Sequence, residues 1–199
     1  NNPPGTLAAV LTQCWSLLQE GVNDRHSAMR TGVVGSVSER GCELRTVVLR
    51  HVEPERRILS FHTDSRSPKV AEILRHARVQ WVFYHPEAKV QLRVSTMAKV
   101  HESDVHSDEA WHLLSPWTRR GYQVLQTPGT PSPIATSGLA EWTANQSPDI
   151  HNTRSGRENF ALVECTIDLL DWLHLGVGRN TRAQFDWRGP ELEATWSTP

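Results

Sequence analysis

A short polar cluster in front of a predicted helix, Arg66, Ser67 and Lys69, has the residue types that bind phosphate. Ser67 followed by Pro68 is typical of a helix start, because serine caps free N–H groups and proline needs no donor at the first helical position. Those N–H groups attract an anion, and Lys69 adds a positive charge beside them. Arg45, on a predicted strand nearby, can add a forked contact. The cluster predicts a phosphate site, although the same residue types also begin helices in proteins that bind no phosphate.

Gln91 is a polar residue inside the predicted strand Val90–Val94. Its amide offers both a donor and an acceptor, which match the alternating polar edge of a heteroaromatic ring. A strand at the solvated edge of a sheet explains Gln91 equally well, because successive residues point to opposite faces. The sequence leaves both interpretations open.

Three histidines, His101, His106 and His112, lie near Asp104. Their spacings of five and six residues do not keep them on one helical face, so we expect surface residues and no metal site. The segment Gly176–Gly178 is a bare Gly-x-Gly outside any predicted βαβ unit. It therefore predicts no dinucleotide site.

The composition limits the class of protein. The 199 residues include 21 Lys plus Arg and 22 Asp plus Glu, for a formal net charge of −1. This balance argues against a protein that coats nucleic acid or an anionic membrane. With 38% hydrophobic and 22% charged residues, the chain is expected to form one globular domain over residues 1–199.

The cysteines and the apolar segments indicate the cellular compartment in which the protein is expected. Cys14, Cys42 and Cys165 form no Cys-x-x-Cys pair, so neither a zinc site nor a disulfide framework is indicated. Such thiols fit a reducing compartment. The longest apolar run, Leu7–Leu11, is too short to span a bilayer, and no basic flank or cleavage site accompanies it. We therefore expect a cytoplasmic protein without a membrane span or a secretion signal.

The period of the apolar residues changes along the chain. Residues 6–21 follow the i, i+3, i+4 spacing of a helix, and residues 67–76 and 104–114 predict two more helices. Short β-branched runs between turn residues predict strands at 33–37, 44–50, 57–63, 79–84, 90–95, 160–167 and 182–187. We expect the first three strands to form an antiparallel meander, and residues 127–157 to form a long loop. The predicted fold is mainly β (α+β), an antiparallel barrel of six to eight strands with peripheral helices.

In their order and spacing, these segments resemble the pyridoxamine 5′-phosphate oxidase-like FMN-binding split-barrel family, from about residue 30 to residue 187. Each mark of the resemblance is weak by itself, but the set is specific. The marks are an Arg-x-Val-Val-Leu strand, a Phe-x-Thr strand end, a Ser and a Lys before a helix, a Gln-x-Arg strand, and a Trp followed ten residues later by Arg. They are found at Arg45–Leu49, Phe61–Thr63, Ser67 with Lys69, Gln91–Arg93, and Trp172 with Arg182.

The resemblance implies FMN as the cofactor and a homodimer with two FMN sites at its interface. A dimer would also cover the exposed edge of a half-barrel. The FMN phosphate would be held by Arg45, Lys69, and Arg66 or Ser67. The ring and the ribityl chain would contact His62, Thr63, Gln91 and the backbone of Thr46, Val47 and Val48. The partner subunit would add Trp172 and Arg182.

The candidate substrate residues depart from the family pattern. They are Arg50, Trp111, Arg119 and Arg179. By the resemblance, Arg50 replaces a lysine that binds the substrate phosphate, Trp111 replaces a tyrosine, and Ser115 replaces an arginine, with Arg119 and Arg120 just beyond. No histidine follows Arg179, where the family has one. The resemblance therefore implies an FMN site that is retained and a substrate site that is altered.

Three functions are compatible with these residues. The first is an FMN-dependent oxidoreductase, whose small-molecule substrate stacks on the flavin ring under the loop at 127–157. The alternative is a non-catalytic flavin carrier or sensor of the same fold. The third is a barrel that binds haem or another planar ligand, which would place a histidine near the ring.

Overall fold

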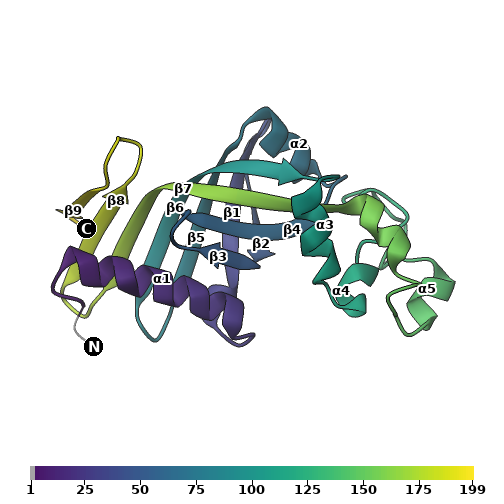
Figure 1. Ribbon diagram of the computed structural model, residues 1–199, viewed down its shortest axis with the longest axis horizontal. Helices are drawn as coiled ribbons and strands as arrows, with labels where there is room; N and C mark the ends of the chain where they lie inside the picture. Colours follow the sequence, from purple (N-terminus) through teal and green to yellow (C-terminus); the bar gives the residue numbers. More distant parts are fainter. Residues whose placement is uncertain (1–2) are drawn as a thin grey trace.

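The computed structural model describes residues 3–199, and residues 1 and 2 of the predicted domain lie outside the described residues. One antiparallel sheet of nine strands dominates the fold, with helices around it (Figure 1). The strands are β1 (Thr31–Ser38), β2 (Gly41–Val48), β3 (His51–Glu53), β4 (Ile58–Asp64), β5 (Arg78–His85), β6 (Val90–His101), β7 (Phe160–Leu175), β8 (Asn180–Asp186) and β9 (Glu193–Ser197). The helices are α1 (Leu7–Asn23), η1 (Ala28–Arg30), α2 (Pro68–Arg75), α3 (Val105–His112), α4 (Pro116–Arg120), α5 (Glu141–Asn145) and η2 (Arg154–Asn159). The predicted fold class is confirmed, and the short strands β3 and β9 raise the strand number above the predicted six to eight.

The strand order is β2-β1-β5-β6-β7-β4-β3, and β8 joins β7 and β9. β1 and β2 form the predicted hairpin, but the predicted meander of three strands is wrong because β4 pairs with β7 and not with β2. β2 therefore lies at one edge of the sheet. The two ends of this strand order, β2 and β3, do not pair with each other among the described residues, so the sheet stays open beside β4 instead of closing into a complete barrel.

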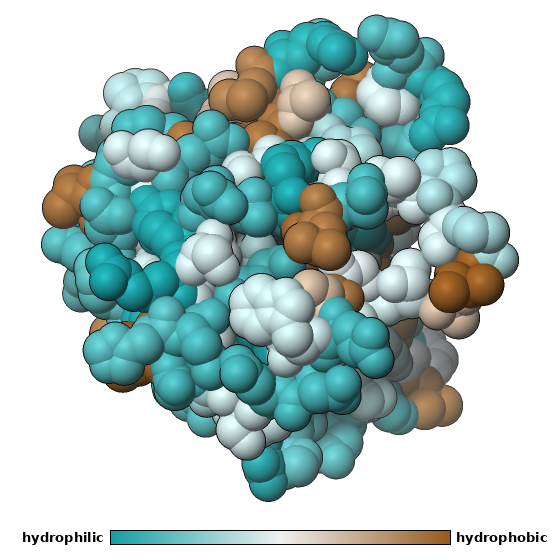
Figure 2. Space-filling view, turned by 90° about the vertical axis from the view of Figure 1, so that its right-hand side faces the viewer, coloured by the Kyte–Doolittle hydropathy of each residue, from teal (hydrophilic) through white to brown (hydrophobic). Residues whose placement is uncertain are grey.

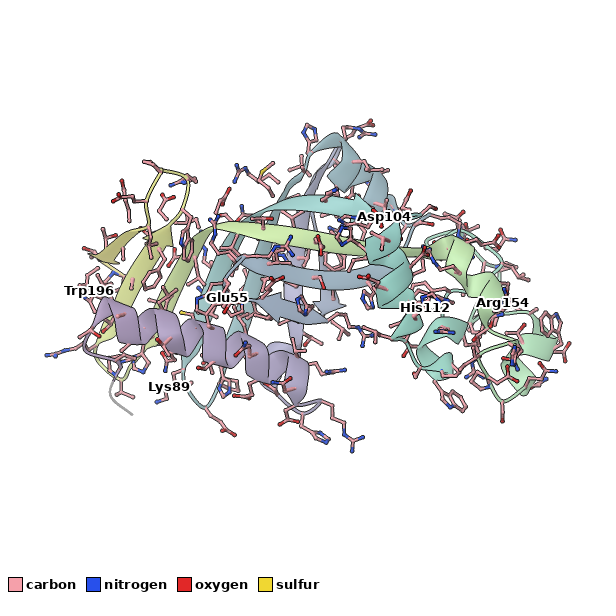
Figure 3. All side chains as sticks on the ribbon, in the orientation of Figure 1. Glu55, Lys89, Asp104, His112, Arg154 and Trp196 are labelled. Atoms are coloured by element: carbon pink, nitrogen blue, oxygen red, sulfur yellow. The ribbon has the colours of Figure 1, made fainter. Side chains whose placement is uncertain are left out.

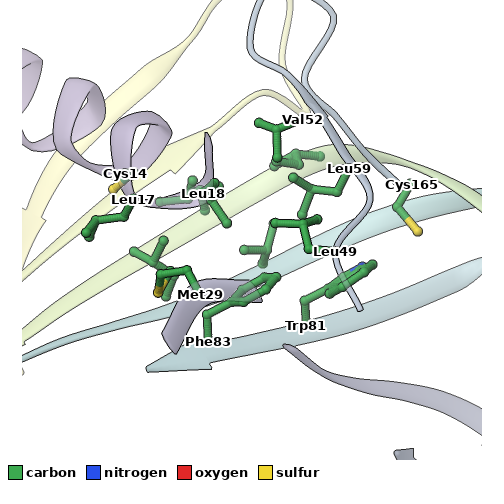
Figure 4. Packing of buried hydrophobic residues seen from close by; sticks show 14 of the residues in the cluster. Cys14, Leu17, Leu18, Met29, Leu49, Val52, Leu59, Trp81, Phe83 and Cys165 are labelled. Carbon is green, nitrogen blue, oxygen red and sulfur yellow. The ribbon is translucent and has the colours of Figure 1, made fainter. Parts of the chain in front are cut away.

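Helix α1 lies across the open side of the curved sheet (Figure 1). Thr6 caps its first turn as predicted, since its hydroxyl accepts a hydrogen bond from the Ala9 N–H at 3.2 Å. The buried face of the helix includes Leu18, which joins the same core as the stacked rings of Trp81 and Phe83 (Figure 4). Burying a large apolar side chain stabilises the fold by about 1.5–3 kcal/mol. The core thus holds α1 and the sheet as one unit.

The opposite side of the sheet carries exposed side chains in regular alternation. In β5, Trp81 is buried while Val82 and Tyr84 are exposed. Val33 of β1 pairs with Val82, and paired residues in an antiparallel sheet share a face. We call this side the outer sheet face; its exposed apolar residues on β1, β2, β5 and β6 are Val33, Val37, Leu44, Val82, Tyr84 and Met97. The face is more apolar than a solvated sheet surface requires.

Helices α3, α4, α5 and η2 gather at one end of the molecule (Figure 1). α3 begins after Asp104, whose carboxylate accepts a hydrogen bond from the Ser107 N–H at 3.0 Å, close to the predicted start. The predicted loop at 127–157 contains α5 and the first half of η2. The sequence pattern did not predict either helix, because both are short and lack apolar residues at a sustained helical spacing.

The prediction that His101 lies on the surface is wrong, whereas His106 and His112 are exposed as predicted. β6 continues to His101, well beyond its predicted end, and this carries the imidazole into the interior. There it lies 2.5 Å from the Asp104 carboxylate and 3.3 Å from that of Glu164. The contact joins the start of α3 to β6 and β7.

The three cysteines are free; Cys14 and Cys165 are buried, and Cys42 is exposed. Burial raises the pKa of the Cys165 thiol to about 12, so this thiol stays protonated. Within residues 3–199, no helix has both the length and the apolar character needed to cross a membrane.

Candidate functional site

A cleft of about 570 Å³ opens between the free edge of β2, the end of β4 and the start of α2. We call it the β2–β4 cleft. The predicted site residues that line it are Arg45, Thr46, Val47, Val48, Arg50, His62, Thr63, Ser67 and Lys69. Four cationic side chains and two acidic side chains, Glu43 and Glu72, belong to its lining. The cleft therefore has an excess of positive charge.

Lys69 lies at the first turn of α2 and points back across the helix start. Its ammonium donates to the Ser67 hydroxyl at 2.5 Å and to the Thr63 hydroxyl at 3.1 Å. Within the described part of the chain it forms no ion pair, so its charge is held by neutral oxygens alone. Burial and the nearby guanidinium of Arg45 lower the pKa of Lys69, as expected for a cation without a counter-ion. An anion entering here would supply the missing partner.

Ser67 occupies the predicted cap position of α2, but its hydroxyl makes no cap hydrogen bond and binds Lys69 instead. Pro68 stands at the first helical position, as predicted. Pro68 has no N–H, and the Val70 N–H donates to the Ser67 carbonyl at 2.9 Å, so the start of α2 adds mainly the positive end of its helix dipole to the charge of Lys69.

Arg45 is held in place by two residues that the sequence interpretation did not identify, Ser36 and Glu72. One terminal nitrogen of its guanidinium donates to the Ser36 hydroxyl, and the other donates to the Glu72 carboxylate at 2.9 Å. Glu72 lies on the second turn of α2 and is buried, as is Ser36 on β1. A glutamate on the buried face of a short helix is the signal that could have revealed this support. The network fixes Arg45 between β1, β2 and α2.

His62 and Arg50 line the inner part of the cleft. His62 packs edge-on against Phe160 at 5.0 Å, and its Nδ1 atom is buried without a hydrogen-bond partner among the described residues. Burial, and then the charge of Arg50, lower the pKa of His62 to about 4, so its imidazole is neutral near pH 7. Burial also lowers the pKa of Arg50, whose guanidinium makes no ion pair in residues 3–199. The cleft thus contains a neutral imidazole beside an unpaired cation.

The backbone of β2 adds a second kind of binding group. β2 pairs with β1 on one side, and no other described strand pairs with its second edge. Alternate N–H and C=O groups along that edge, from Leu44 to Val48, therefore lack a strand partner beside the cleft. Such an edge can hydrogen-bond the polar rim of a flat ligand.

Arg66 does not line the cleft, although it is only one residue from Ser67. Its guanidinium binds the Asp64 carboxylate through two contacts, of 3.0 and 2.7 Å, and donates to the Val124 carbonyl at 3.0 Å. Asp64 and Val124 both border a second hollow. The guanidinium of Arg66 therefore lies on the side of β4 that faces the second hollow, and not on the side of the cleft.

The second hollow, of about 910 Å³, lies under the segment from Gly121 to Leu139. We call it the loop cavity. Thr63 lines both the loop cavity and the β2–β4 cleft, so the two spaces meet at the end of β4. Tyr122 lines the cavity and packs edge-on against Phe160, and burial raises the pKa of its phenol to about 12. Figure 2 shows this end of the molecule, where hydrophilic and apolar side chains are mixed over the surface.

Gln91 and Arg182 lie on the outer sheet face, away from the cleft of their own chain. Tyr84 pairs with Gln91, Gln91 with Leu173, and Leu173 with Arg182, which places all four in one row across the sheet. Arg182 is held by two contacts to Asp171, of 2.9 and 2.5 Å. Figure 3 shows Lys89 and Trp196, near neighbours of this row, at the end opposite His112 and Arg154. One chain by itself does not bring Gln91 and Arg182 to its own cleft.

Three predicted residues are buried where no ligand reaches them. Trp172 has no exposed surface, and its indole N–H donates to the Gln13 side chain at 3.0 Å beneath α1. Trp111 is 4% exposed, and Arg119, 5% exposed, stacks on its ring and donates to its carbonyl. These three side chains stabilise the fold here, and we leave them out of the proposed site. Arg179 lies in the exposed turn between β7 and β8 and lines neither hollow.

The open antiparallel sheet has the fold of the pyridoxamine 5′-phosphate oxidase-like split barrel. Residues 12–102 match the family model described as pyridoxamine 5′-phosphate oxidase, FMN-binding domain. The resemblance inferred from the sequence is thereby confirmed. The matched segment runs from α1 through β6 and includes Arg45, Ser67 and Lys69.

Solved structures share the fold over nearly the whole chain. A pyridoxamine 5′-phosphate oxidase-related, FMN-binding protein from Nostoc punctiforme is 23% identical, with a TM-score of 0.75, over 94% of this chain and 96% of that chain. PhzG from Burkholderia lata, solved in complex with tetrahydrophenazine-1-carboxylic acid, is 15% identical, with a TM-score of 0.68, over 100% of this chain and 95% of that chain. At these identities the likeness establishes the fold alone. No curated protein sequence matches the chain.

Proposed function

We propose that the protein is an FMN-dependent oxidoreductase that works as a homodimer. The observation that carries the proposal is the Lys69 ammonium, which has no ion-pair partner among the described residues and lies beside Arg45 at the free edge of β2. A charged group in such a position is stabilised when a phosphate binds. The match of residues 12–102 to an FMN-binding domain supports the same conclusion.

The residues of the cleft fit FMN in two parts. Lys69, Ser67 and Arg45 would hold the phosphate, because they combine two positive charges with a hydroxyl group at the start of α2. The unpaired edge of β2, from Thr46 to Val48, would hydrogen-bond the polar rim of the ring. Arg66 has no place in this arrangement, since Asp64 and Val124 occupy its donors.

Bound FMN would supply hydride transfer, which no side chain of the protein can perform. The chain itself would position and protect the reactants. His62, kept neutral by burial and by Arg50, would offer one hydrogen-bond donor or acceptor without adding charge. Arg50 is the candidate substrate residue that remains available, and its cation would attract an anionic group of a ligand at the inner end of the cleft.

The dimer would form through the outer sheet face. Its exposed apolar residues, Val33, Leu44, Val82 and Tyr84, extend over three neighbouring strands, an arrangement typical of an interface. The edge of β2 with the cleft lies at one side of this face, and the row of Gln91 and Arg182 crosses the other side. A two-fold contact would then bring the partner's Gln91 and the partner's Arg182 to each cleft.

A sedimentation measurement tests the dimer. We expect a mass near twice the 22.5 kDa chain, and a Val82→Glu variant should be monomeric with weakened FMN binding. A stable monomer that retains FMN would contradict the shared site.

The visible spectrum of the purified protein tests the cofactor. We expect a yellow protein with flavin absorbance that releases FMN, and not FAD, on denaturation. A haem spectrum, or a colourless protein that takes up no added FMN, would contradict the proposal.

The alternative function, a flavin carrier or sensor without catalysis, is favoured by one observation: Trp111 and Arg119 of the expected substrate site are buried. The two functions differ in turnover. An oxidoreductase should reduce or reoxidise its flavin faster in the presence of an organic substrate, and a carrier should show no such dependence.

The remaining expectations are a single domain and a cytoplasmic location. Three free cysteines, two of them buried, support a reducing compartment. One large core that includes both α1 and β8, the last strand but one, supports a single folded unit.

A further inference from the structure

The loop cavity differs from the cleft in charge. Among the described residues that line it, Asp64 is the only charged side chain. The nearest guanidinium, Arg66, is already bound to Asp64 at 2.7 Å and points to the Val124 carbonyl. A phosphate in this space would face a carboxylate and find no free cation, and an unpaired charge is costly to bury.

The polar groups of the cavity wall are largely used by the loop itself. Thr130 donates to the Thr127 carbonyl at 2.7 Å, and Ser132 donates to the Ile134 carbonyl at 2.7 Å. The Thr136 hydroxyl accepts from the Gly138 N–H at 2.9 Å. The hydroxyl protons of Thr130 and Ser132 are therefore used within the loop, and no cationic side chain lines the cavity among the described residues. The other lining groups include the rings of Pro128, Pro131 and Pro133 and the side chains of Val124, Leu125 and Leu139.

The cavity wall is tied to the rest of the fold. The Leu125 N–H donates to the Gly138 carbonyl at 2.8 Å, which closes the loop at its neck. The Asn159 side chain donates to the Tyr122 carbonyl at 2.8 Å, and Arg66 holds Val124. These contacts join the loop to β4 and to the start of β7. The space is therefore formed before a ligand enters.

We propose that the loop cavity binds the body of an uncharged organic substrate, a molecule without a phosphate group. A volume of about 910 Å³ lies within the usual range of small-molecule sites, which combine apolar walls with few polar groups. The substrate reaches the flavin past Thr63, where the cavity meets the β2–β4 cleft. This inference rests on the proposed function for the position of the flavin. The preference for an uncharged ligand follows from the residues of the cavity wall alone.

Matched pairs of ligands test the inference. The probes are pyridoxine with pyridoxine 5′-phosphate, and 2-naphthol with 2-naphthyl phosphate. Binding is measured by calorimetry on the purified protein, with excess FMN and inorganic phosphate present to fill the cleft. We expect the uncharged member of at least one pair to bind at least tenfold more tightly than its phosphate ester. Equal or tighter binding of both esters, or no binding of either uncharged probe, would overturn the inference.

A charge placed on the cavity wall tests the location. Gln126 lines the cavity, is exposed, and makes no side-chain hydrogen bond among the described residues, so Gln126→Arg should fold normally. The new cation should tighten binding of the phosphate ester by about tenfold and so reduce the preference for the uncharged probe. Gln146→Arg is the matched control, because Gln146 is exposed on the same connecting segment and does not line the cavity. An equal response of the two variants would place the ligand elsewhere.

The two proposals can fail separately. Absence of FMN uptake, read from the absorbance spectrum, would remove the proposed function and leave the preference for uncharged probes as a property of the cavity. A preference for phosphate esters in protein that retains FMN would remove the inference alone.

Discussion

The β2–β4 cleft and the loop cavity share Thr63 but are built from different kinds of structure. Strands and the start of α2 form the cleft, and buried partners hold its charged groups, as Glu72 holds Arg45. A single irregular segment forms most of the cavity, and its wall is nearly free of charge. Under the proposed function, regular elements would bind the cofactor and a loop would select the ligand.

The division also separates two neighbouring cations. Lys69 faces the cleft and has only hydroxyl partners, whereas Arg66, three residues earlier, is neutralised by Asp64 and holds the wall of the cavity. Changes to these residues should therefore affect different ligands.

The largest expected effect is the loss of folding stability at low pH that is due to His62, on the wall of the cleft. The pKa of His62 is about 4 in the folded protein, below its ordinary value of 6.5, so the unfolded chain binds more protons between those pH values. Stability should be full above pH 6.5 and fall as the pH drops toward 4, by about 3 kcal/mol from this residue. Urea unfolding of the wild-type protein and of His62→Gln, across this range, measures the contribution. His151→Gln, an exposed change in the segment beyond the cavity, is the control; if it flattens the pH dependence as much as His62→Gln does, the assignment is wrong.

Turnover of pyridoxine or pyridoxamine 5′-phosphate should be weak, because the cavity has no free cation for the phosphate and Ser115 cannot replace a guanidinium. Misplacement of a substrate against a cofactor costs on the order of a hundredfold in rate. We therefore expect kcat/KM at least a hundredfold below about 10⁴ M⁻¹s⁻¹. An oxygen-consumption assay measures it, and a value near 10⁴ M⁻¹s⁻¹ would show that Arg50 alone can hold the phosphate.

Removing either cation of the cleft should weaken FMN binding. Lys69→Ala and Arg45→Ala should each cost about 1.5–3 kcal/mol, since each removes a charge-assisted bond to the phosphate. Riboflavin, which has no phosphate, should lose much less affinity. Fluorescence titration compares the two flavins, and equal losses for both would indicate damage to the fold. Lys69→Ala is the cleaner test, because Arg45→Ala also leaves Glu72 buried without its ion pair.

The smallest effect on FMN is expected from Arg66→Ala, the matched control for Lys69→Ala. Its guanidinium does not line the cleft, so the FMN affinity should change by less than about 0.5 kcal/mol. Loss of the contact to Val124 should instead loosen the loop, and limited proteolysis within 124–139 should become faster. A loss of FMN affinity as large as that of Lys69→Ala would place Arg66 at the phosphate and remove the contrast between the two spaces.

Local patterns in the sequence were enough for the helices α1 and α2, the hairpin of β1 and β2, and the closeness of Ser67 and Lys69. Thr6 caps α1 where predicted, and Ser67 and Lys69 meet because they are one helical turn or less apart. Interactions of this range depend on backbone geometry, which residue types control directly. The mainly β class follows from the same local periods.

Partners that are distant in the sequence could be found only in the folded chain. β4 pairs with β7, about a hundred residues later in the chain. The alternation of apolar residues predicts that a segment is a strand, but it does not indicate which other strand pairs with it. Glu72 pairs with Arg45 across 27 residues of sequence, whereas Asp64 pairs with Arg66 only two residues away, so the two arginines serve different spaces. Trp172 and Leu173 point to opposite faces of β7, and the packing of α1 decides that the tryptophan belongs to the core. The sequence by itself determined most helices and strands and the positions of the charged residues along the chain. The tertiary structure decided which charged side chains remain without an ion-pair partner, because the partner of a side chain depends on packing across the whole sheet.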